Sequence, residues 1–386
     1  MGSNHEQLHA DLPATNAVIG KMPSQLRVLI VAPSTQMIGG QSVQADILLR
    51  RLALEANIAV SLQPINPMFA GSLGALQKIK FARTLVTIPA YVFQLIRSVR
   101  QADVVHVFSA SYLSFVLSVW PAIRVARWFG KPLVLNYHSG EAFDHLRTWP
   151  SAVRQIRMAN KLVVPSPFLV RVFQAHGLNA EVVPNVVDVQ SIKFKARSEV
   201  RPRFLANRNF EIHYNVPLVL RAFRIIQDAI PDAILTVAGA GPCNTDIREL
   251  ALNLGLRNIN FVGRVNPADM PELYANHDIW LNGSDVDNMP LSILECFAAG
   301  VAIVSTNAGG IPDLVDSGST GLLSACGDAA MLAKNAISLA VQPELHSRLT
   351  QAGKLECVKY TWLSVLSQWL ELYNSVRVSK CPHRVA

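Results

Sequence analysis

Short apolar runs rich in β-branched residues alternate with longer helical stretches along this chain. In the first half these runs are continuously apolar, which is typical of strands in a parallel sheet that helices cover on both faces. A glycine pair and an expected helix at 42–54 follow the first run, and a second expected helix covers 111–130. This half is therefore predicted to form a doubly wound α/β domain. Its predicted strands are 27–33, 58–65, 103–109, 131–138, 160–166 and 180–185.

The same alternation of apolar runs and helical stretches begins again after a polar, basic, proline-bounded segment at 184–203. A helix is expected at 218–229, and an amphipathic helix at 361–376 ends the pattern. We expect two tandem Rossmann-like, doubly wound parallel-sheet domains that face a cleft, with the C-terminal helix crossing back to the first domain. The predicted strands of this half are 233–242, 258–265, 278–284, 302–310 and 321–324. The expected parts of the chain are a disordered leader at 1–24, a first domain at 25–190, a second domain at 191–358 and the C-terminal helix at 359–386.

Composition narrows the class of protein. With 386 residues, 50% of them hydrophobic and 16% charged, the chain can bury large cores and is not globally disordered. Its five cysteines form no C-x-x-C pair, which argues against a cysteine-rich zinc site and favours a reducing, cytoplasmic compartment. The first residues have no signal-peptide core. The apolar run Val104–Ile123 contains His106, four serines and Pro121, so a strand followed by a buried helix explains it better than a lipid span.

The basic residues are concentrated in the first half of the chain. Residues 1–200 contain 20 Lys and Arg against 10 Asp and Glu, whereas residues 201–386 contain 15 against 17. The stretch Lys78–Arg100 interleaves bases with Phe81, Tyr91 and Phe93, as in basic helices that lie on anionic membranes. An ordinary surface helix with a solvated basic face is the alternative. No finger, basic zipper or RNA-binding signature supports nucleic acid as a partner.

One carboxylate in the second half points to a ligand. Between Asn288 and Pro312, Glu295 is the only charged residue, and a lone carboxylate in an apolar helix needs a hydrogen-bonding partner. Glu295 is a candidate acceptor for a ligand's hydroxyls, although a backbone contact or a distant arginine could also satisfy it. Pro290 suits the first turn of this helix and Asp287 or Asn288 its N-cap, so the helix N-terminus is a candidate phosphate site.

The segment D-N-M-P-L-S-I-L-E at 287–295 resembles the E-x(7)-E signature of the retaining glycosyltransferases of family 4, which have the GT-B fold. Other stretches match that family in the same order: Gly39-Gly40, L-N-Y-H-S at 135–139, P-N-V-V-D at 184–188, G-A-G-P at 239–242 and G-G-I-P-D at 309–313. The resemblance extends from Arg27 to Tyr373, and the order and spacing of the motifs carry it rather than any single motif.

The resemblance implies a retaining, metal-independent enzyme of polysaccharide biosynthesis. It would move a sugar from a nucleotide diphosphate sugar to a hydroxyl of a glycan, lipid-linked or small-molecule acceptor. Glu295 would bind the ribose, Arg208 would neutralise the diphosphate, Asp287 would meet the donor sugar, and His138 would lie near sugar and acceptor. The implied catalytic residues are His138, Arg208 and Asp287. The implied donor-binding residues are Gly39, Gly40, Arg208, Gly241, Val262, Asn288, Met289, Pro290, Leu291 and Glu295. No cofactor is implied, and the location would be cytoplasmic, with the inner face of the membrane as a candidate surface.

Three residues depart from the family pattern. Asp287 and Asp313 stand where the family has Glu, and the lysine expected shortly after Arg208 is absent, since His213, Tyr214 and Asn215 occupy that area. Two alternatives therefore stay open, a catalytically silent nucleotide-sugar or glycan-binding partner protein and a nucleotide-sugar epimerase. The D-x-D triplet at 285–287 precedes a P-L-x-x-x-E helix and is interpreted as a chance match to a metal motif. G-A-G-P-C-N lacks the third glycine of a dinucleotide-binding loop.

Overall fold

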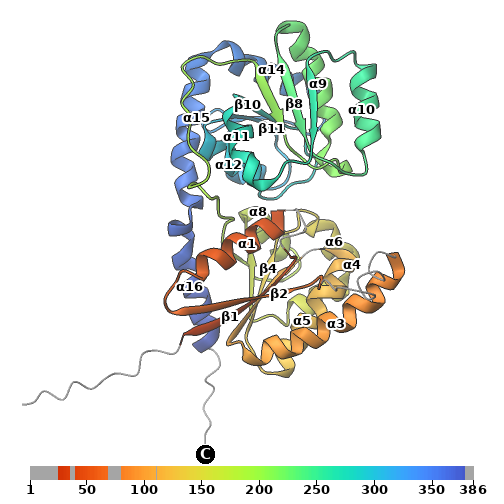
Figure 1. The fold of residues 1–386 in the computed structure, drawn as a ribbon, viewed down its shortest axis with the longest axis vertical. Helices are drawn as coiled ribbons and strands as arrows, with labels where there is room; N and C mark the ends of the chain where they lie inside the picture. Colours follow the sequence, from red (N-terminus) through yellow and green to blue (C-terminus); the bar gives the residue numbers. More distant parts are fainter. Residues whose placement is uncertain (1–24, 35–39, 68–79, 110, 379–386) are drawn as a thin grey trace, which may run out of the picture.

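The fold consists of two α/β lobes stacked along the long axis of the molecule (Figure 1). The computed structural model describes residues 25–34, 40–67, 80–109 and 111–378. Each lobe is built on a six-stranded sheet in which every paired strand is parallel to its neighbour. The prediction of two tandem Rossmann-like domains is therefore confirmed.

The first sheet has the strand order β2-β1-β3-β4-β5-β6. The chain runs from β1 outward to β2 and then returns past β1 to β3, so the order reverses beside β1. The strands are β1 Leu26–Ala32, β2 Ile58–Pro64, β3 Val104–Ser109, β4 Leu133–Tyr137, β5 Lys161–Val164 and β6 Glu181–Val182. The helices are α1 Gly40–Leu52, α3 Lys80–Gln101, α4 Tyr112–Ser114, the π-helix η1 Phe115–Val119, α5 Trp120–Trp128, α6 Ala142–Thr148, α7 Pro150–Ile156 and α8 Pro167–Gln174.

Both faces of the first sheet are buried, as the apolar strands predict. Leu29 and Val31 of β1 face a core formed with α3, α5, α7 and α8. Val28 and Ile30 face the opposite core, which contains α1 and the C-terminal helix α16 (Trp362–Val378). Helix α16 thus packs on the first lobe, as expected, and its Tyr373 hydroxyl hydrogen-bonds His106 Nδ1 at 2.8 Å. In Figure 1 this helix runs down the side of the first lobe.

The second sheet has the order β12-β11-β10-β7-β8-β9. From β7 the chain builds outward to β9 and then crosses to β10 on the other side of β7. The strands are β7 Arg203–Ala206, β8 Ile234–Ala238, β9 Ile259–Gly263, β10 Ile279–Asn282, β11 Ala302–Thr306 and β12 Leu322–Ser324. The helices are η2 Ile212–Tyr214, α9 Val216–Ala229, α10 Asn244–Asn253, η3 Pro267–Asp269, α11 Met270–Ala275, α12 Leu291–Ala299, α13 Ile311–Leu314, α14 Ala329–Val341, α15 Pro343–Cys357 and η4 Val358–Tyr360.

The strand list predicted from the sequence lacks β7, which lies at the centre of this sheet. The run is only four residues long, and it follows the segment at 184–203 that the sequence suggests is a polar linker. The later part of that segment, from Lys195 onward, is in fact anchored to the second lobe. The Arg197 side chain, 2% exposed, donates to Asp278 Oδ1 at 2.9 Å and to several backbone carbonyls. A buried arginine with a buried carboxylate and carbonyl acceptors is a structural core element, not a solvated connection.

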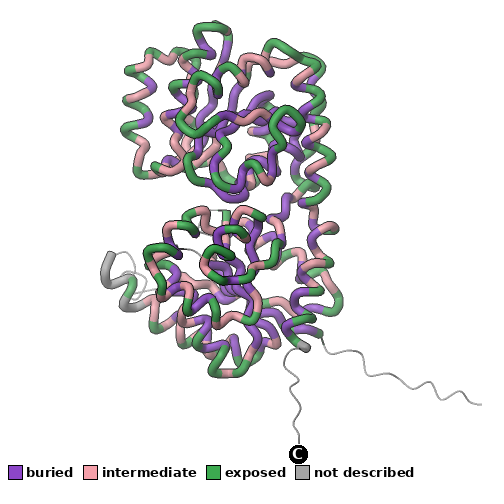
Figure 2. The backbone as a smooth tube through the Cα atoms, turned by 180° about the vertical axis from the view of Figure 1, so that it is seen from behind, coloured by how far each residue is buried: buried purple, intermediate pink, exposed green. Residues whose placement is uncertain are grey.

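The chain crosses between the lobes twice, and the two crossings lie side by side. The backbone N–H of Val187 donates to the carbonyl of Tyr360 at 2.9 Å, which joins the first crossing to the second. Arg51 of α1 pairs with Asp188 at 3.1 Å next to this point. In both views the chain passes between the lobes at this one edge of the molecule (Figure 1, Figure 2).

None of the helices in the described part of the chain combines the length and apolarity needed to cross a membrane. The run Val104–Ile123 folds as strand β3 and then the helices α4, η1 and the first turn of α5, apart from residue 110, which lies outside the described residues.

Candidate functional site

A cavity of about 490 Å³ lies between the two lobes. Ligands of open parallel sheets bind outside the carboxyl ends of the strands, where the strand order reverses. In the first lobe the cavity is lined by Gly40, which follows β1, and by residues after β4. In the second lobe it is lined by residues that follow β7 and β10, the two strands at the reversal. The topology therefore brings both reversal points to one groove.

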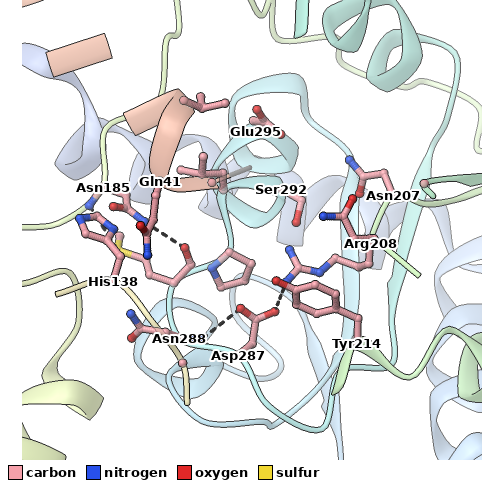
Figure 3. A pocket seen from close by; sticks show the side chains of 18 of the residues that line it. Gln41, His138, Asn185, Asn207, Arg208, Tyr214, Asp287, Asn288, Ser292 and Glu295 are labelled. Atoms are coloured by element: carbon pink, nitrogen blue, oxygen red, sulfur yellow. Dashed lines mark hydrogen bonds and ion pairs between the residues drawn. The ribbon is translucent and has the colours of Figure 1, made fainter. Parts of the chain in front are cut away.

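Arg208 and Asp287 meet at the second-lobe reversal point. Arg208 follows β7 and Asp287 follows β10, and the Arg208 guanidinium donates to Asp287 Oδ2 at 2.5 Å (Figure 3). The side chains are only 13% and 9% exposed. The Tyr214 ring lies against the guanidinium, with 4.0 Å from Arg208 Cζ to the ring centroid. Burial lowers the pKa of Arg208, but Asp287 and the neighbouring tyrosines raise it more, so the group is a fixed cation.

Glu295 lies on α12 and faces the same cavity. Its Oε2 accepts a hydrogen bond from the Tyr274 hydroxyl at 2.6 Å. Asn207 Nδ2 donates to the Tyr274 oxygen at 2.7 Å, and Trp280 Nε1 donates to Asn207 Oδ1 at 2.5 Å. This chain of donors, which we call the Trp280–Glu295 relay, fixes one carboxylate oxygen and leaves the other free for a ligand. Burial raises the pKa of Glu295, while the Tyr274 hydrogen bond and Arg208 oppose the rise.

The loop 287–290 and the start of α12 form the floor of the cavity. Asn288, Met289, Pro290 and Leu291 all line it. The expectation that Asp287 or Asn288 caps the helix is wrong, because α12 begins at Leu291 with an extended Pro290 at the N-cap position and no side-chain cap. Asp287 instead pairs with Arg208 and accepts from the N–H of Asn288 at 3.0 Å. The first N–H groups of α12 therefore have no side-chain cap, as a phosphate-binding terminus requires.

The first lobe supports this loop directly. Ser166 donates to Asn288 Oδ1, and Asn185 Nδ2 donates to the carbonyl of Met289 at 3.1 Å. On the far side of the loop, Asp313 accepts from the backbone N–H of Phe168 at 2.6 Å and pairs with Arg171 at 3.1 Å. Both Phe168 and Arg171 belong to α8, whose N-terminal end abuts the second lobe (Figure 1).

The expected glycine and strand residues divide into three groups. Gly40 lines the cavity with open space around it, and Gly39 lies outside the described residues. Gly241 does not line the cavity: a Cβ there would lie 2.5 Å from the carbonyl oxygen of Phe210, so this glycine permits a close backbone approach that supports the loop. Val262 does not line it either, since it lies 49% exposed on the edge strand β9. The structure does not bring these last two residues to the site.

His138 follows β4 and its ring lines the cavity. The ring stacks on Phe108 with 5.1 Å between centroids, and its buried Nε2 has no hydrogen-bond partner among the described residues. Burial lowers the pKa of His138 to about 3, so the imidazole is neutral at physiological pH. A second void of about 10 Å³, roughly the room for one water, adjoins His138 and the unpartnered Asn136 Oδ1. His138 is therefore not a core histidine with a satisfied ring.

Several residues of the site have no motif that would predict them, whether they line the cavity or, like Tyr274, contact a residue that does. Asn207 and Tyr274 stand far from Glu295 in sequence, and only the fold brings them together. Gln41, Tyr214 and Arg264 also line the cavity. The only signal that points toward Tyr214 is a negative one, the missing lysine after Arg208.

The D-x-D carboxylates face different partners. Asp285 accepts from Asn215 Nδ2 at 2.9 Å, whereas Asp287 pairs with Arg208. Within the described ranges, no cluster of three or more His, Cys, Asp or Glu side chains is arranged to hold a metal ion.

Known proteins share both the sequence pattern and the fold. Residues 38–191 match the family model described as Glycosyltransferase Family 4, and residues 188–356 match Glycosyl transferases group 1. The sulfoquinovosyl transferase of Arabidopsis thaliana is 26% identical over 287 residues, which cover 67% of this chain and 54% of that protein. The phosphatidyl-myo-inositol mannosyltransferase of Mycobacterium leprae is 26% identical over 302 residues, 74% of this chain and 76% of that protein.

Among solved structures, HepE of Anabaena in complex with UDP-glucose aligns over 91% of this chain and all of its own, with a TM-score of 0.72 at 16% identity. Two parallel-sheet lobes joined at one edge, with the cleft at both strand reversals, are the architecture of GT-B glycosyltransferases. The two consecutive domain matches agree with that architecture, and the chain belongs to the glycosyltransferases of the GT-B type. The match to the Arabidopsis protein spans about half of that protein's length.

Proposed function

We propose that this chain transfers a sugar from a nucleotide diphosphate sugar to an acceptor hydroxyl. The observation that carries the proposal is the position of Arg208 and Glu295 on one cavity, at the strand reversal of the second sheet. Arg208 and the uncapped start of α12 suit a diphosphate, and the free oxygen of Glu295 suits the two adjacent hydroxyls of a ribose. The solved relative HepE binds UDP-glucose, so uridine diphosphate sugars are the first donors to test.

In the proposed mechanism the bond between the anomeric carbon and the diphosphate oxygen breaks, and its electron pair leaves with the diphosphate. The acceptor oxygen forms the new bond on the same face, which retains the anomeric configuration. The acceptor proton passes to the leaving phosphate oxygen. Arg208 and the N–H groups of α12 stabilise the charge that develops on the diphosphate. His138, held neutral, lies on the first-lobe side of the cavity, where the acceptor would bind.

The direct test combines donor binding with transfer. The purified chain is screened against nucleotide sugars by thermal shift, because a ligand that binds the folded state raises the melting temperature. The stabilising donors are then incubated with candidate acceptors, and product is detected by mass spectrometry. The configuration of the new bond is read by NMR, and an inverted product would contradict retention.

We also propose that transfer needs no divalent metal. The support is that Asp285 and Asp287 have separate protein partners rather than a shared open site. Turnover should persist in EDTA. Loss of turnover in EDTA and its recovery with Mn²⁺ would show that the D-x-D carboxylates bind metal.

We further propose that the protein binds an anionic membrane surface on the cytoplasmic side. Helix α3 exposes Phe93 to 62%, with Arg97 beside its ring, and Trp128 at the end of α5 is 76% exposed. Tyr91, in contrast, is buried and does not belong to this surface. The side chains at 80–83 lie outside the described set, as does residue 78. Anionic vesicles should sediment the protein at low salt, and equal recovery with neutral vesicles would refute this proposal.

The ion pair between Arg208 and Asp287 favours one alternative, a silent sugar-binding member, because it neutralises the cation that the diphosphate needs. Such a protein would bind a nucleotide sugar but release no nucleoside diphosphate in any acceptor mixture. An epimerase would instead convert the nucleotide sugar to an isomer without any acceptor, which chromatography of the donor detects.

A further inference from the structure

The cavity contains little positive charge for a diphosphate. Among the described lining residues, the fixed cations are Arg208 and Arg264, and the carboxyl groups are Glu141, Asp287 and Glu295. Asp287 already pairs with Arg208. No lysine belongs to this lining. If a diphosphate binds here, a further donor beside Arg208 would add to the N–H groups of α12, and a neutral hydroxyl is a suitable group.

Tyr214 is positioned to be that donor. Its ring lies on the Arg208 guanidinium at 4.0 Å, and Figure 3 shows its hydroxyl end pointing toward the Arg208–Asp287 pair. Tyr214 lines the cavity, and its hydroxyl has no hydrogen-bond partner among the described residues. The phenol therefore has a free donor beside the cation that would hold the diphosphate.

The backbone around Tyr214 is fixed. The next residue, Asn215, has φ +40°, an uncommon left-handed conformation for a residue other than glycine. Its side chain accepts from the N–H of Leu218 at 3.2 Å and donates to Asp285, which ties η2 to the start of α9 and to the loop after β10. The His213 ring also packs against Tyr214, with 4.2 Å between centroids. The phenol is thus held in place before any ligand binds.

The protonation state of Tyr214 suits a donor. Arg208 lowers the pKa of the phenol, but burial and the nearby carboxylates together raise it by more. The pKa of Tyr214 therefore lies above its ordinary value. The hydroxyl therefore keeps its proton throughout the neutral range.

We propose that Tyr214 takes over the position of the missing lysine: its hydroxyl donates a hydrogen bond to the diphosphate, and its ring holds Arg208 in place beside it. This inference rests on the proposed function, since it assigns a contact within the same donor site. A hydrogen bond to a charged group changes an equilibrium by about 10–100-fold. The contact exists only with phosphate, so it should strengthen diphosphate binding and leave nucleoside binding unchanged.

The test is calorimetry with UDP, ADP and GDP and with the three matching nucleosides. Tyr214→Phe keeps the ring on Arg208 and removes only the hydroxyl, and we expect about 10-fold or greater loss of diphosphate affinity with nucleoside affinity unchanged. Tyr214→Lys should bind the diphosphate at least as well as the wild type, with a steeper salt dependence. The matched control is Tyr360→Phe, which removes a phenol hydroxyl that donates to Glu356 near the chain crossings, and neither of these residues lines the cavity.

The outcomes separate the two proposals. If the wild type binds none of the three diphosphates, the proposed function fails and this inference fails with it. If the wild type binds one of them and Tyr214→Phe binds it equally well, the inference alone is overturned. Equal losses for the diphosphate and its nucleoside in Tyr214→Phe would also overturn it, because the hydroxyl would then be shaping the site instead of contacting phosphate.

Discussion

Replacing Glu295 should weaken nucleotide binding and, at the same time, stabilise the empty protein. The carboxylate lies on the cavity with one oxygen held by Tyr274 and the other free. Each hydrogen bond between a ribose hydroxyl and a carboxylate contributes about 1.5–3 kcal/mol, so losing two of them in Glu295→Ala weakens binding by roughly 10²–10⁴-fold. Glu295→Gln keeps one neutral acceptor and should show a smaller loss.

The stability effect has the opposite sign. Burial raises the pKa of Glu295, so the folded protein binds this proton more tightly than the unfolded chain does. The ionised carboxylate therefore costs stability at pH values above its folded-state pKa, and the cost disappears as the pH falls through that pKa. Glu295→Gln should melt at a higher temperature than the wild type at pH 7, and the two should converge in acid.

The assay is calorimetry with UDP and with uridine, alongside thermal melts from pH 7 downward. Both ligands carry the ribose, so both should lose affinity in the Glu295 variants. The matched control is Glu141→Gln, another carboxyl group on the cavity wall but on the first lobe, which should leave nucleotide affinity unchanged. Unchanged uridine and UDP affinity in Glu295→Ala, or a lower melting temperature in Glu295→Gln, would refute the reasoning.

Three further predictions follow from particular contacts. Tyr274→Phe breaks the Trp280–Glu295 relay, so UDP affinity should fall by about 10-fold, and calorimetry that shows wild-type affinity would contradict the positioning role. Asp313→Ala should loosen the contact between α8 and the second lobe and shift the lobes apart, because it removes the acceptor of both Phe168 N–H and Arg171. Small-angle scattering should then give a larger radius of gyration, and an unchanged radius would argue against this role of Asp313. His106 and His138 are held neutral by burial, with pKa values of about 3, so stability should fall as the pH drops below the unfolded-state value. At about pH 5 the loss is roughly 2 kcal/mol for each of these two histidines. Burial also lowers the pKa values of His145, His277 and His346. In denaturant titrations, His106→Gln should therefore lose less stability in acid than the wild type, by about 2 kcal/mol, and an equal loss would contradict the role of His106.

The sequence predicts the elements whose signal is local. Continuous apolar runs identify most strands, and the solitary charge of Glu295 in an apolar helix identifies a residue that lines the cavity. Strand β7 is missed because only three apolar residues, Phe204–Ala206, carry its signal, and the basic segment before it suggests a linker. Its central position depends on pairing with β8 and β10, strands that are distant in the sequence.

The contacts that set the chemistry of the site are long-range. Arg208 and Asp287 are 79 residues apart, and Tyr274 and Glu295 are 21 apart, so no periodicity could pair them. The helix-capping prediction fails for the same reason, since a partner from another strand end competes for the Asp287 carboxylate. Val262 lies in a predicted strand that proves to be an edge strand, and strand position cannot be read from a single run.

Asp287 and Asp313, which both stand where the family has Glu, belong to one rigid unit formed by the segments 287–288 and 309–313. The N–H of Gly310 donates to the carbonyl of Asp287 at 3.1 Å, and Gly309 and Gly310 pack so closely on the 287–288 backbone that a Cβ at either would overlap it. Asp287 at one end of this unit therefore cannot move far without displacing Asp313 at the other. Helix α8 of the first lobe hydrogen-bonds Asp313, and Ser166, just before α8, donates to Asn288. The position of the first lobe therefore fixes the position of the Asp287 carboxylate. A diphosphate that reaches Arg208 competes with Asp287 for the guanidinium, so donor binding and lobe closure must influence one another through this unit.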